Sequence, residues 1–185
     1  MAVQVLTSCE AQVESQIRKT LQSMAESQAA QLSSDQMHVV LLGTGGPIPN
    51  ETRDTSGTAI IAGGEFIMVD VGPGIVKNMN LAALPAGHLS GLLLTHYHSD
   101  HISDLGELNF MTWAQGRDWP LDVYGPEGVE QVVDGYSMAY ALDSSYRTEH
   151  HTEGWMPSKN AVMKAHTLTI PDPEETVTFF DRNGL

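Results

Sequence analysis

The sequence has few basic residues, one cysteine and no long apolar run. Nine Lys and Arg face 23 Asp and Glu, which gives a net charge of −14 over 185 residues. Nucleic-acid binding relies on clustered basic residues, and no basic stripe is present. No stretch approaches the roughly 20 apolar residues of a membrane span. The first residues lack a basic start followed by an apolar block, so no secretory signal is predicted.

The single cysteine, Cys9, has no partner for an internal disulfide. Its isolation is compatible with a reducing compartment, and we expect a cytoplasmic protein with no membrane association. The length suits one domain with a real core and is too short for two ordinary domains.

Residues 1–36 are predicted to form an amino-terminal helical appendage and a linker. Val13, Ile17, Leu21 and Met24 fall at helical spacing within residues 10–32, and "SSDQ" at 33–36 has the composition of a linker. Because this apolar stripe is narrow, two alternatives stay open. The helix packs on its own domain, or it pairs with a second chain in a homo-oligomer.

Residues 37–185 are predicted to form one α/β domain, because short apolar runs alternate with glycine-rich turns and helical patterns. Gly63 and Gly64 form a tight turn between two of the strands. The predicted strands are 37–43, 58–63, 65–72, 89–96, 120–126, 161–170 and 175–181, and the predicted helices are 73–84, 102–115 and 127–142.

The chain ends where a hairpin is expected. Asn183 and Gly184 form the strongest short hairpin pattern, yet only Leu185 follows them. We therefore expect the domain to be incomplete at its carboxyl end, with a returning strand missing.

Four potential metal ligands follow the buried strand at "LSGLLLTH". They are His96, His98, Asp100 and His101. Imidazole and carboxylate groups suit zinc, with manganese or iron as alternatives. Residues two apart in an extended backbone point the same way, so His96 and His98 can bind one ion, while Asp100 and His101 can face a second. Two neighbouring ions suit displacement at phosphorus or a carbonyl, and Asp100 can also accept or donate a proton. The opposing interpretation is a chance cluster of surface histidines at a helix start.

The segment "THYHSDH" resembles the His-x-His-x-Asp-His motif of the metallo-β-lactamase superfamily of hydrolases. Its flanks "LLGTGGPIPNETRDTSG", "VDVGPG" and "LDVYGPEG" are similar to the branch that contains ribonuclease Z and related phosphodiesterases. The resemblance covers residues 37 to about 130 and fades beyond them.

This resemblance implies an αββα sandwich and a two-zinc site. His96 and His98 would bind the first zinc, and Asp100 and His101 the second. Asp100 would also be the catalytic proton acceptor or donor. Asp70 would lie behind the ligands and hold the metal loop, as outer carboxylates commonly do.

The sequence departs from the superfamily pattern in its second half. The superfamily completes its site with two later histidines and a bridging aspartate, and no remaining histidine stands in a matching setting. These histidines are His38, His88, His150, His151 and His166. We therefore expect an amino-terminal partial chain that holds only the first half of the sandwich. Glu149, His150 and His151 are an alternative source of ligands, although a solvated loop is the preferred interpretation of that segment.

The expected function is that of a metal-dependent hydrolase that cleaves phosphodiester bonds with a zinc-activated water. Transfer-RNA processing is disfavoured, since residues 143–160 lack the glycine- and proline-rich composition of an RNA-clamping arm and the net charge is −14. The expected partner is a small ester or phosphodiester rather than a nucleic acid. The alternative is a truncated, non-catalytic fragment that binds metal weakly or serves in protein interactions.

Overall fold

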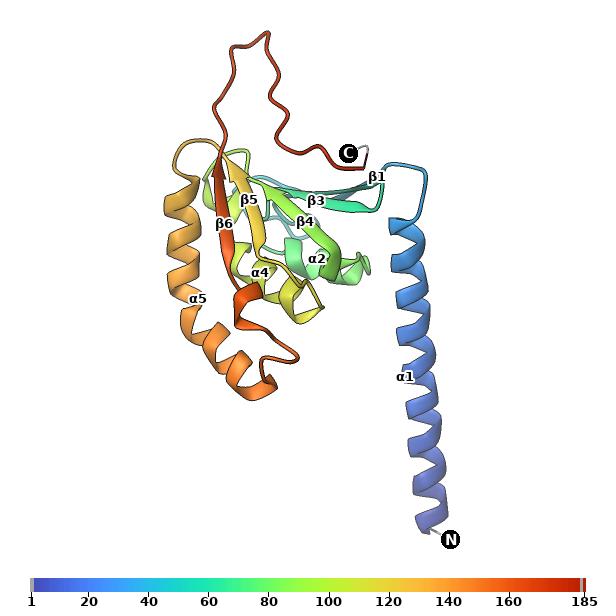
Figure 1. Ribbon diagram of the computed structural model, residues 1–185. Coiled ribbons are helices and arrows are strands. Elements are labelled where there is room, and N and C mark those ends of the chain that lie inside the picture. The colour runs from blue at the N-terminus through green and yellow to red at the C-terminus, as the bar shows by residue number, and fades with distance from the viewer. Residues whose placement is uncertain (1, 184) are drawn as a thin grey trace.

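The computed structural model describes residues 2–183 and 185, with side chains described from residue 12 onward. One six-stranded sheet in the order β1-β2-β3-β4-β5-β6 forms the centre of the domain (Figure 1). Its strands are β1 (His38–Thr44), β2 (Ser56–Ala62), β3 (Glu65–Val69), β4 (Leu89–Leu93), β5 (Leu121–Gly125) and β6 (Met163–Thr167). β1, β2 and β3 pair antiparallel, and β3 to β6 pair parallel. The predicted α/β class is therefore confirmed.

The helices are α1 (Ala2–Leu32), α2 (Ile75–Leu81), α3 (Ser99–Ile102), α4 (Leu105–Ala114) and α5 (Val129–His151), with short 3₁₀ turns at Ala86–His88 and Ser158–Asn160. Each parallel strand needs a crossover to reach its neighbour, and α2, α4 and α5 supply these connections. The predicted helix over residues 102–115 is divided, since α3 ends at Ile102 and α4 begins at Leu105.

The turn between β2 and β3 is the one that the sequence predicts. Gly63 and Gly64 have φ angles of 58° and 83°, a left-handed conformation that glycine adopts without steric cost. Ala62 therefore pairs directly with Glu65 across the hairpin, as expected for a two-residue turn.

One face of the sheet carries α2, α4 and α5 and contains the hydrophobic core (Figure 1). Successive side chains of a strand point to opposite faces of the sheet, and the side chains on one face contact these helices. The buried core side chains include Leu42, Ala59, Ile61, Phe66, Met68, Leu92, Leu121 and Val123 from the sheet, and Ile75, Val76, Met79, Leu105, Leu108, Val129 and Val133 from the helices.

No helix among the described residues lies over the opposite face of the sheet (Figure 1). Val39 and Leu41 of β1 are 56% and 66% exposed. The segment after β6 crosses this face toward β3: Phe179 packs edge-on against Tyr124 with ring centroids 5.4 Å apart, and Asn183 Nδ2 donates to Glu65 Oε1.

The predicted strand over residues 175–181 is wrong, because this crossing segment forms no ladder with any described strand. Phe179 contacts the face of the sheet at Tyr124, and the segment does not extend an edge of the sheet. Asn183 has a φ of 48°. The predicted turn also requires Gly184, which lies outside the described residues.

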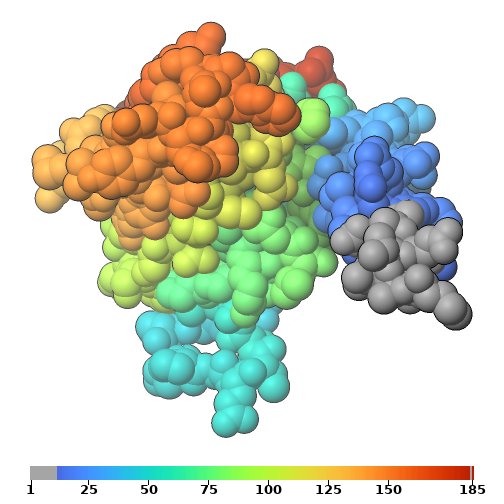
Figure 2. Space-filling model, turned by 90° about the horizontal axis from the view of Figure 1, so that it is seen from below, coloured from blue at the N-terminus to red at the C-terminus, as the bar shows by residue number. Residues whose placement is uncertain are grey.

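Helix α1 is longer than predicted, since it begins at Ala2 rather than near residue 10. It projects from the domain (Figure 1), and Figure 2, which views the molecule from below, shows it at the margin of the body. Val13, Ile17 and Leu21 are 59%, 53% and 60% exposed. Among the described side chains of α1, those near its end contact the domain, through packing of Leu32 on the core and a hydrogen bond from Gln28 Nε2 to the Leu84 carbonyl.

The predicted packing of this stripe on its own domain is therefore wrong. Pairing of α1 with a second chain stays a prediction, as does the domain boundary after residue 36. No helix in the described part of the chain is both long and apolar enough to cross a membrane.

Helix α5 continues to His151, well past the predicted end at residue 142. The loop predicted around Glu149, His150 and His151 is therefore wrong, because these residues form the exposed last turn of a long helix. Residues 143–151 contain no Gly or Pro that would end a helix earlier.

Candidate metal centre

The histidine cluster follows β4, which lies between β3 and β5 in the sheet. Four of the five residues of β4 are buried, so this strand is covered on both faces, as its continuous apolar sequence predicts. Leu94 N donates to the Tyr124 carbonyl at 2.8 Å and fixes the loop where it leaves the sheet. Loops at the carboxyl ends of parallel strands are where open α/β sheets bind their ligands.

His96 and His98 form one facing pair. His96 Nε2 lies 3.0 Å from His98 Nδ1, and the two rings meet edge to face with centroids 4.7 Å apart. Tyr97 between them faces the other way, and its hydroxyl donates to the Pro126 carbonyl. Burial, followed by the charge of Glu130, raises the pKa of Tyr97. The alternation of the extended backbone thus places both imidazoles together and the tyrosine ring against the next loop.

Asp100 and His101 form the second pair at the start of α3. Asp100 Oδ2 lies 3.6 Å from His101 Nε2, and Asp100 is buried, with 7% of its surface exposed. The ring centroid of His101 is 4.0 Å from that of His96. The structure therefore brings all four residues predicted from the motif into one cluster.

Asp70 lies behind this cluster, immediately after β3, and is 3% exposed. Its carboxylate accepts from Thr95 N at 2.8 Å, from the Thr95 hydroxyl at 2.9 and 3.0 Å, and from His101 Nδ1 at 2.8 Å. Ser56 Oγ donates to it at 3.3 Å. This geometry is what a carboxylate that holds the metal loop requires, although the role itself stays a prediction.

The loop after Asp70 packs directly on the metal loop. Val71 N donates to the His101 carbonyl at 2.8 Å, and Asp104 N donates to the Val71 carbonyl at 2.9 Å. A Cβ atom on Gly72 would lie 1.9 Å from the Asp100 carbonyl oxygen, so only glycine permits this approach. The "VDVGPG" segment therefore contacts α3 and the residue that precedes α4.

Two contributors were missed by sequence reasoning. Thr95 links Asp70 to His96, since its hydroxyl also lies 3.1 Å from His96 Nδ1. Asp104 accepts from Val76 N at 3.2 Å at the start of α2, and burial raises its pKa even though backbone N–H groups oppose the shift. In the sequence, the one feature that indicates a role for Thr95 in the site is its position directly before His96.

The donor set fits zinc, because imidazole nitrogen and carboxylate oxygen are ordinary zinc ligands. Each pair offers two of the three protein ligands that catalytic zinc sites use. Among the side chains that the structure describes, from residue 12 onward, no three of His, Cys, Asp or Glu converge on one point suited to an ion.

The remaining histidines lie elsewhere in the fold. His166 Nε2 contacts Asp122 Oδ1 at 2.8 Å and stacks on Tyr124. His150 and His151 end a helix of 23 residues, roughly 33 Å from its first turn by the 1.5 Å rise per residue. Since that first turn is the end next to Tyr97, these histidines do not reach the cluster.

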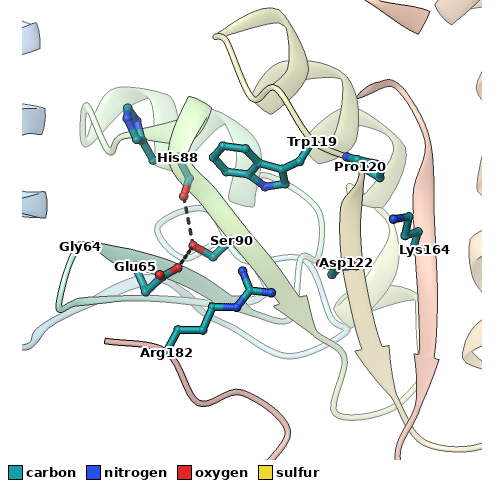
Figure 3. Close-up of a pocket in the computed structure, with 9 residues that line it drawn as sticks. All are labelled: Gly64, Glu65, His88, Ser90, Trp119, Pro120, Asp122, Lys164 and Arg182. Atoms are coloured by element: carbon teal, nitrogen blue, oxygen red, sulfur yellow. Dashed lines mark hydrogen bonds between the residues drawn. The ribbon is translucent and has the colours of Figure 1, made fainter. Parts of the chain in front are cut away.

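A separate pocket of about 380 Å³ lies at the other end of β4 (Figure 3). Its lining includes His88 and Ser90 at the start of this strand, together with Glu65 and Arg182. Ser90 Oγ donates to Glu65 Oε2 at 2.5 Å, and the His88 ring points away from that hydroxyl in Figure 3. The pocket and the cluster therefore occupy opposite ends of the strand.

Known proteins with similar sequences include several that are named ribonuclease Z. Ribonuclease Z of Mycolicibacterium gilvum is 40% identical over 142 residues, which cover 75% of this chain and 45% of that protein. Ribonuclease Z of Mycobacterium marinum is 38% identical over 157 residues, which cover 80% and 51%. The chain thus spans about half the length of the curated relatives that it matches.

Solved structures show the same fold. Human tRNase Z, short form, superposes with a TM-score of 0.51 at 30% identity, over 58% of this chain and 39% of that chain. The metallo-β-lactamase fold protein YhfI from Bacillus subtilis superposes with a TM-score of 0.50 at 23% identity, over 78% and 49%.

The sheet, its helices and these relatives show a protein that resembles ribonuclease Z and has the metallo-β-lactamase fold. Residues 37–170 match the family model described as anti-Pycsar protein Apyc1, and the chain belongs to this family.

Proposed function

We propose that the chain belongs to a metal-dependent hydrolase that cleaves phosphodiester bonds, with zinc as its metal and manganese or iron as alternatives. The observation that carries this proposal is the adjacency of the two pairs, His96 with His98 and Asp100 with His101, at the carboxyl end of β4. The names of the curated relatives, ribonuclease Z, support a phosphodiester as the substrate.

Each pair of residues would bind a different metal ion. His96 and His98 would hold one ion, and Asp100 and His101 the other. Ions held there would polarise the ester and lower the pKa of a bound water molecule. Asp100 is buried beside His101, so its carboxylate can accept a proton from that water or return one to the leaving oxygen. Asp70 orients His101 through the hydrogen bond at Nδ1.

The net charge of −14 favours a small phosphodiester over a folded RNA. A long polyanion meets repulsion from the whole acidic surface, whereas a small ester meets only the local charge of the site. No Gly- or Pro-rich arm interrupts residues 143–151, which are the last turns of α5.

Hydrolysis of bis(p-nitrophenyl) phosphate by the zinc-reconstituted chain tests this proposal. His98→Ala removes one ligand of the first pair, and we expect the rate to fall at least about 100-fold, because even outer-shell partners cost 10- to 100-fold. His150→Ala is the matched control. This histidine is exposed at the end of α5, where its ring packs edge-on against His151, away from the cluster. We expect the control to retain the parent rate.

Equal rates for the parent, His98→Ala and His150→Ala would contradict the proposal. So would zinc content that His98→Ala leaves unchanged, measured by native mass spectrometry. Cleavage of a transfer-RNA precursor in preference to the small diester would retain the hydrolase and overturn the assignment of a small substrate.

A second candidate is a non-catalytic chain that binds metal weakly or serves in protein interactions. The observation that favours it is that each proposed ion has only two ligands among the described residues. Two tightly held zinc ions per monomer, together with turnover, would exclude this candidate. One loosely held ion without turnover would favour it.

A further inference from the structure

We propose that Thr95 is a positioning residue that fixes which ring nitrogen of His96 carries the proton. Its hydroxyl lies between two groups: Asp70, at 2.9 and 3.0 Å from the two carboxylate oxygens, and His96 Nδ1, at 3.1 Å. Its backbone N–H also donates to Asp70 Oδ1 at 2.8 Å, so the residue is held from two directions.

Counting hydrogens at this hydroxyl decides the direction of each bond. A threonine hydroxyl has one hydrogen to donate and lone pairs to accept with. An ionised carboxylate has only acceptors, and a hydrogen bond to it is stronger than one to a neutral group. The single hydrogen of Thr95 is therefore directed to Asp70. The contact with His96 must then be one in which Thr95 Oγ1 accepts.

His96 Nδ1 consequently carries a hydrogen, and His96 Nε2 has its lone pair free. This nitrogen is the one that faces His98 at 3.0 Å and that the first ion would use. A neutral imidazole in water favours the opposite tautomer, with the hydrogen on Nε2. The hydroxyl of Thr95 thus selects the form of His96 that is ready to bind.

Asp70 performs the same selection on the second pair without an intermediary. It accepts from His101 Nδ1 at 2.8 Å, which leaves His101 Nε2 free on the side of Asp100. One buried carboxylate therefore orients an imidazole in each pair, directly in His101 and through Thr95 in His96.

His98 differs from the other two imidazoles. Its Nδ1 faces the lone pair of His96 Nε2, so in the metal-free chain the hydrogen between them belongs to His98. To offer Nδ1 as a ligand, His98 would have to carry this hydrogen on Nε2 instead, with no change in its charge. This step rests on the proposed function, whereas the tautomers of His96 and His101 in the metal-free chain do not.

The experiment is nitrogen-15 NMR of the histidine rings in the metal-free chain at mildly alkaline pH. We expect the Nδ1–H form for His96 and His101, and after zinc addition a change of tautomer at His98 alone. Finding His96 in the Nε2–H form in the parent chain would overturn the proposal, whatever the behaviour of any variant.

Two substitutions then isolate the hydroxyl. Thr95→Val has the same shape without the hydroxyl, and Thr95→Ser keeps the hydroxyl without the methyl group. We expect Thr95→Val to shift His96 toward Nε2–H and to raise the zinc Kd about 10- to 100-fold, as losses of groups behind metal ligands do, while Thr95→Ser keeps both properties of the parent. A Thr95→Val chain that retains the Nδ1–H form, or a Thr95→Ser chain that loses it, contradicts the proposal.

These readouts separate the proposal from the function. A chain with the expected tautomers and no phosphodiester hydrolysis would contradict only the proposed function. A chain that hydrolyses the diester with His96 in the Nε2–H form would contradict only the role of Thr95.

Discussion

At the scale of single residues, Asp70 combines an unusual backbone conformation with an exceptional number of partners. Its φ of 60° lies in the left-handed region, where Asp and Asn are enriched among residues other than glycine. This conformation turns the chain sharply at the end of β3 and directs the carboxylate to Thr95 and His101. We therefore expect both the turn and the histidine cluster to depend on this one side chain.

Asp70→Asn tests this dependence, because asparagine tolerates the same backbone conformation but has no charge. We expect the free energy of unfolding to fall by about 1.5–3 kcal/mol, the worth of a hydrogen bond to a charged group. We also expect zinc affinity to fall about 10- to 100-fold. Urea denaturation and zinc titration with a chelating dye measure these two effects.

The matched control is Asp118→Asn, at an exposed position between α4 and β5. We expect it to change the free energy of unfolding by no more than about 0.5 kcal/mol, as is usual for surface sites. Equal effects of the two substitutions would contradict the role of Asp70.

At the scale of elements, Arg117 joins the end of α4 to the segments around β5. It is 1% exposed, and burial lowers its pKa to about 10. Its guanidinium donates to the Asn109 side chain at 2.7 Å, the Thr112 hydroxyl at 3.0 Å and the Asn160 carbonyl at 3.1 Å, and also to the Trp119 carbonyl. These bonds compensate for the buried charge, and the charge of Asp122 opposes the lowering of the Arg117 pKa.

Arg117→Lys keeps the charge but replaces the planar group by a single ammonium, which cannot reach all of these acceptors. We expect a loss of at least about 2 kcal/mol in the free energy of unfolding, since each buried acceptor without a donor costs about 1–3 kcal/mol. Urea denaturation measures it. Arg18→Lys on the exposed helix α1 is the control, and a loss no larger than that of the control would contradict the prediction.

The elements also show where sequence patterns succeed. β4 and the hairpin of β2 and β3 are confirmed because their patterns are local: a continuous apolar run, and two glycines between strands. The strand predicted over 175–181 is wrong for a non-local reason. A strand exists only if a neighbour offers a free edge, and this segment instead crosses the face of the sheet at Tyr124.

At the scale of the whole molecule, four tyrosines share a response to alkaline pH. Burial raises the pKa of Tyr97, Tyr124, Tyr136 and Tyr140 above the ordinary value of 10. The unfolded chain therefore releases these protons at a lower pH than the folded chain. The contribution of these groups to stability is complete below pH 10 and is lost as the pH rises from 10 through the raised folded values.

Arg117 acts in the opposite direction, because a lowered pKa means that its folded form loses the proton first. Tyr136→Phe removes one of the four tyrosine contributions and leaves Arg117 unchanged. We therefore expect the stability of Tyr136→Phe relative to the parent chain, measured by urea denaturation, to increase as the pH rises above 10. A difference between the two chains that does not change with pH would contradict this prediction.

The sequence by itself determined the cluster. His96, His98, Asp100 and His101 are close because an extended backbone and a helix start bring neighbours in the chain together, which needs no distant contact. The same locality made the class of the fold and the turn at Gly63 and Gly64 predictable.

Only the tertiary structure decided what surrounds the cluster. Asp70 is 25 residues away from Thr95 and 31 from His101, and the hydrogen bonds between them exist because β3 and β4 pair in parallel, with their ends at the same edge of the sheet. The exposure of α1, the length of α5 and the path of residues 168–183 likewise depend on which surfaces other elements leave free. Local patterns carry no information about such surfaces, because they arise only when distant segments pack.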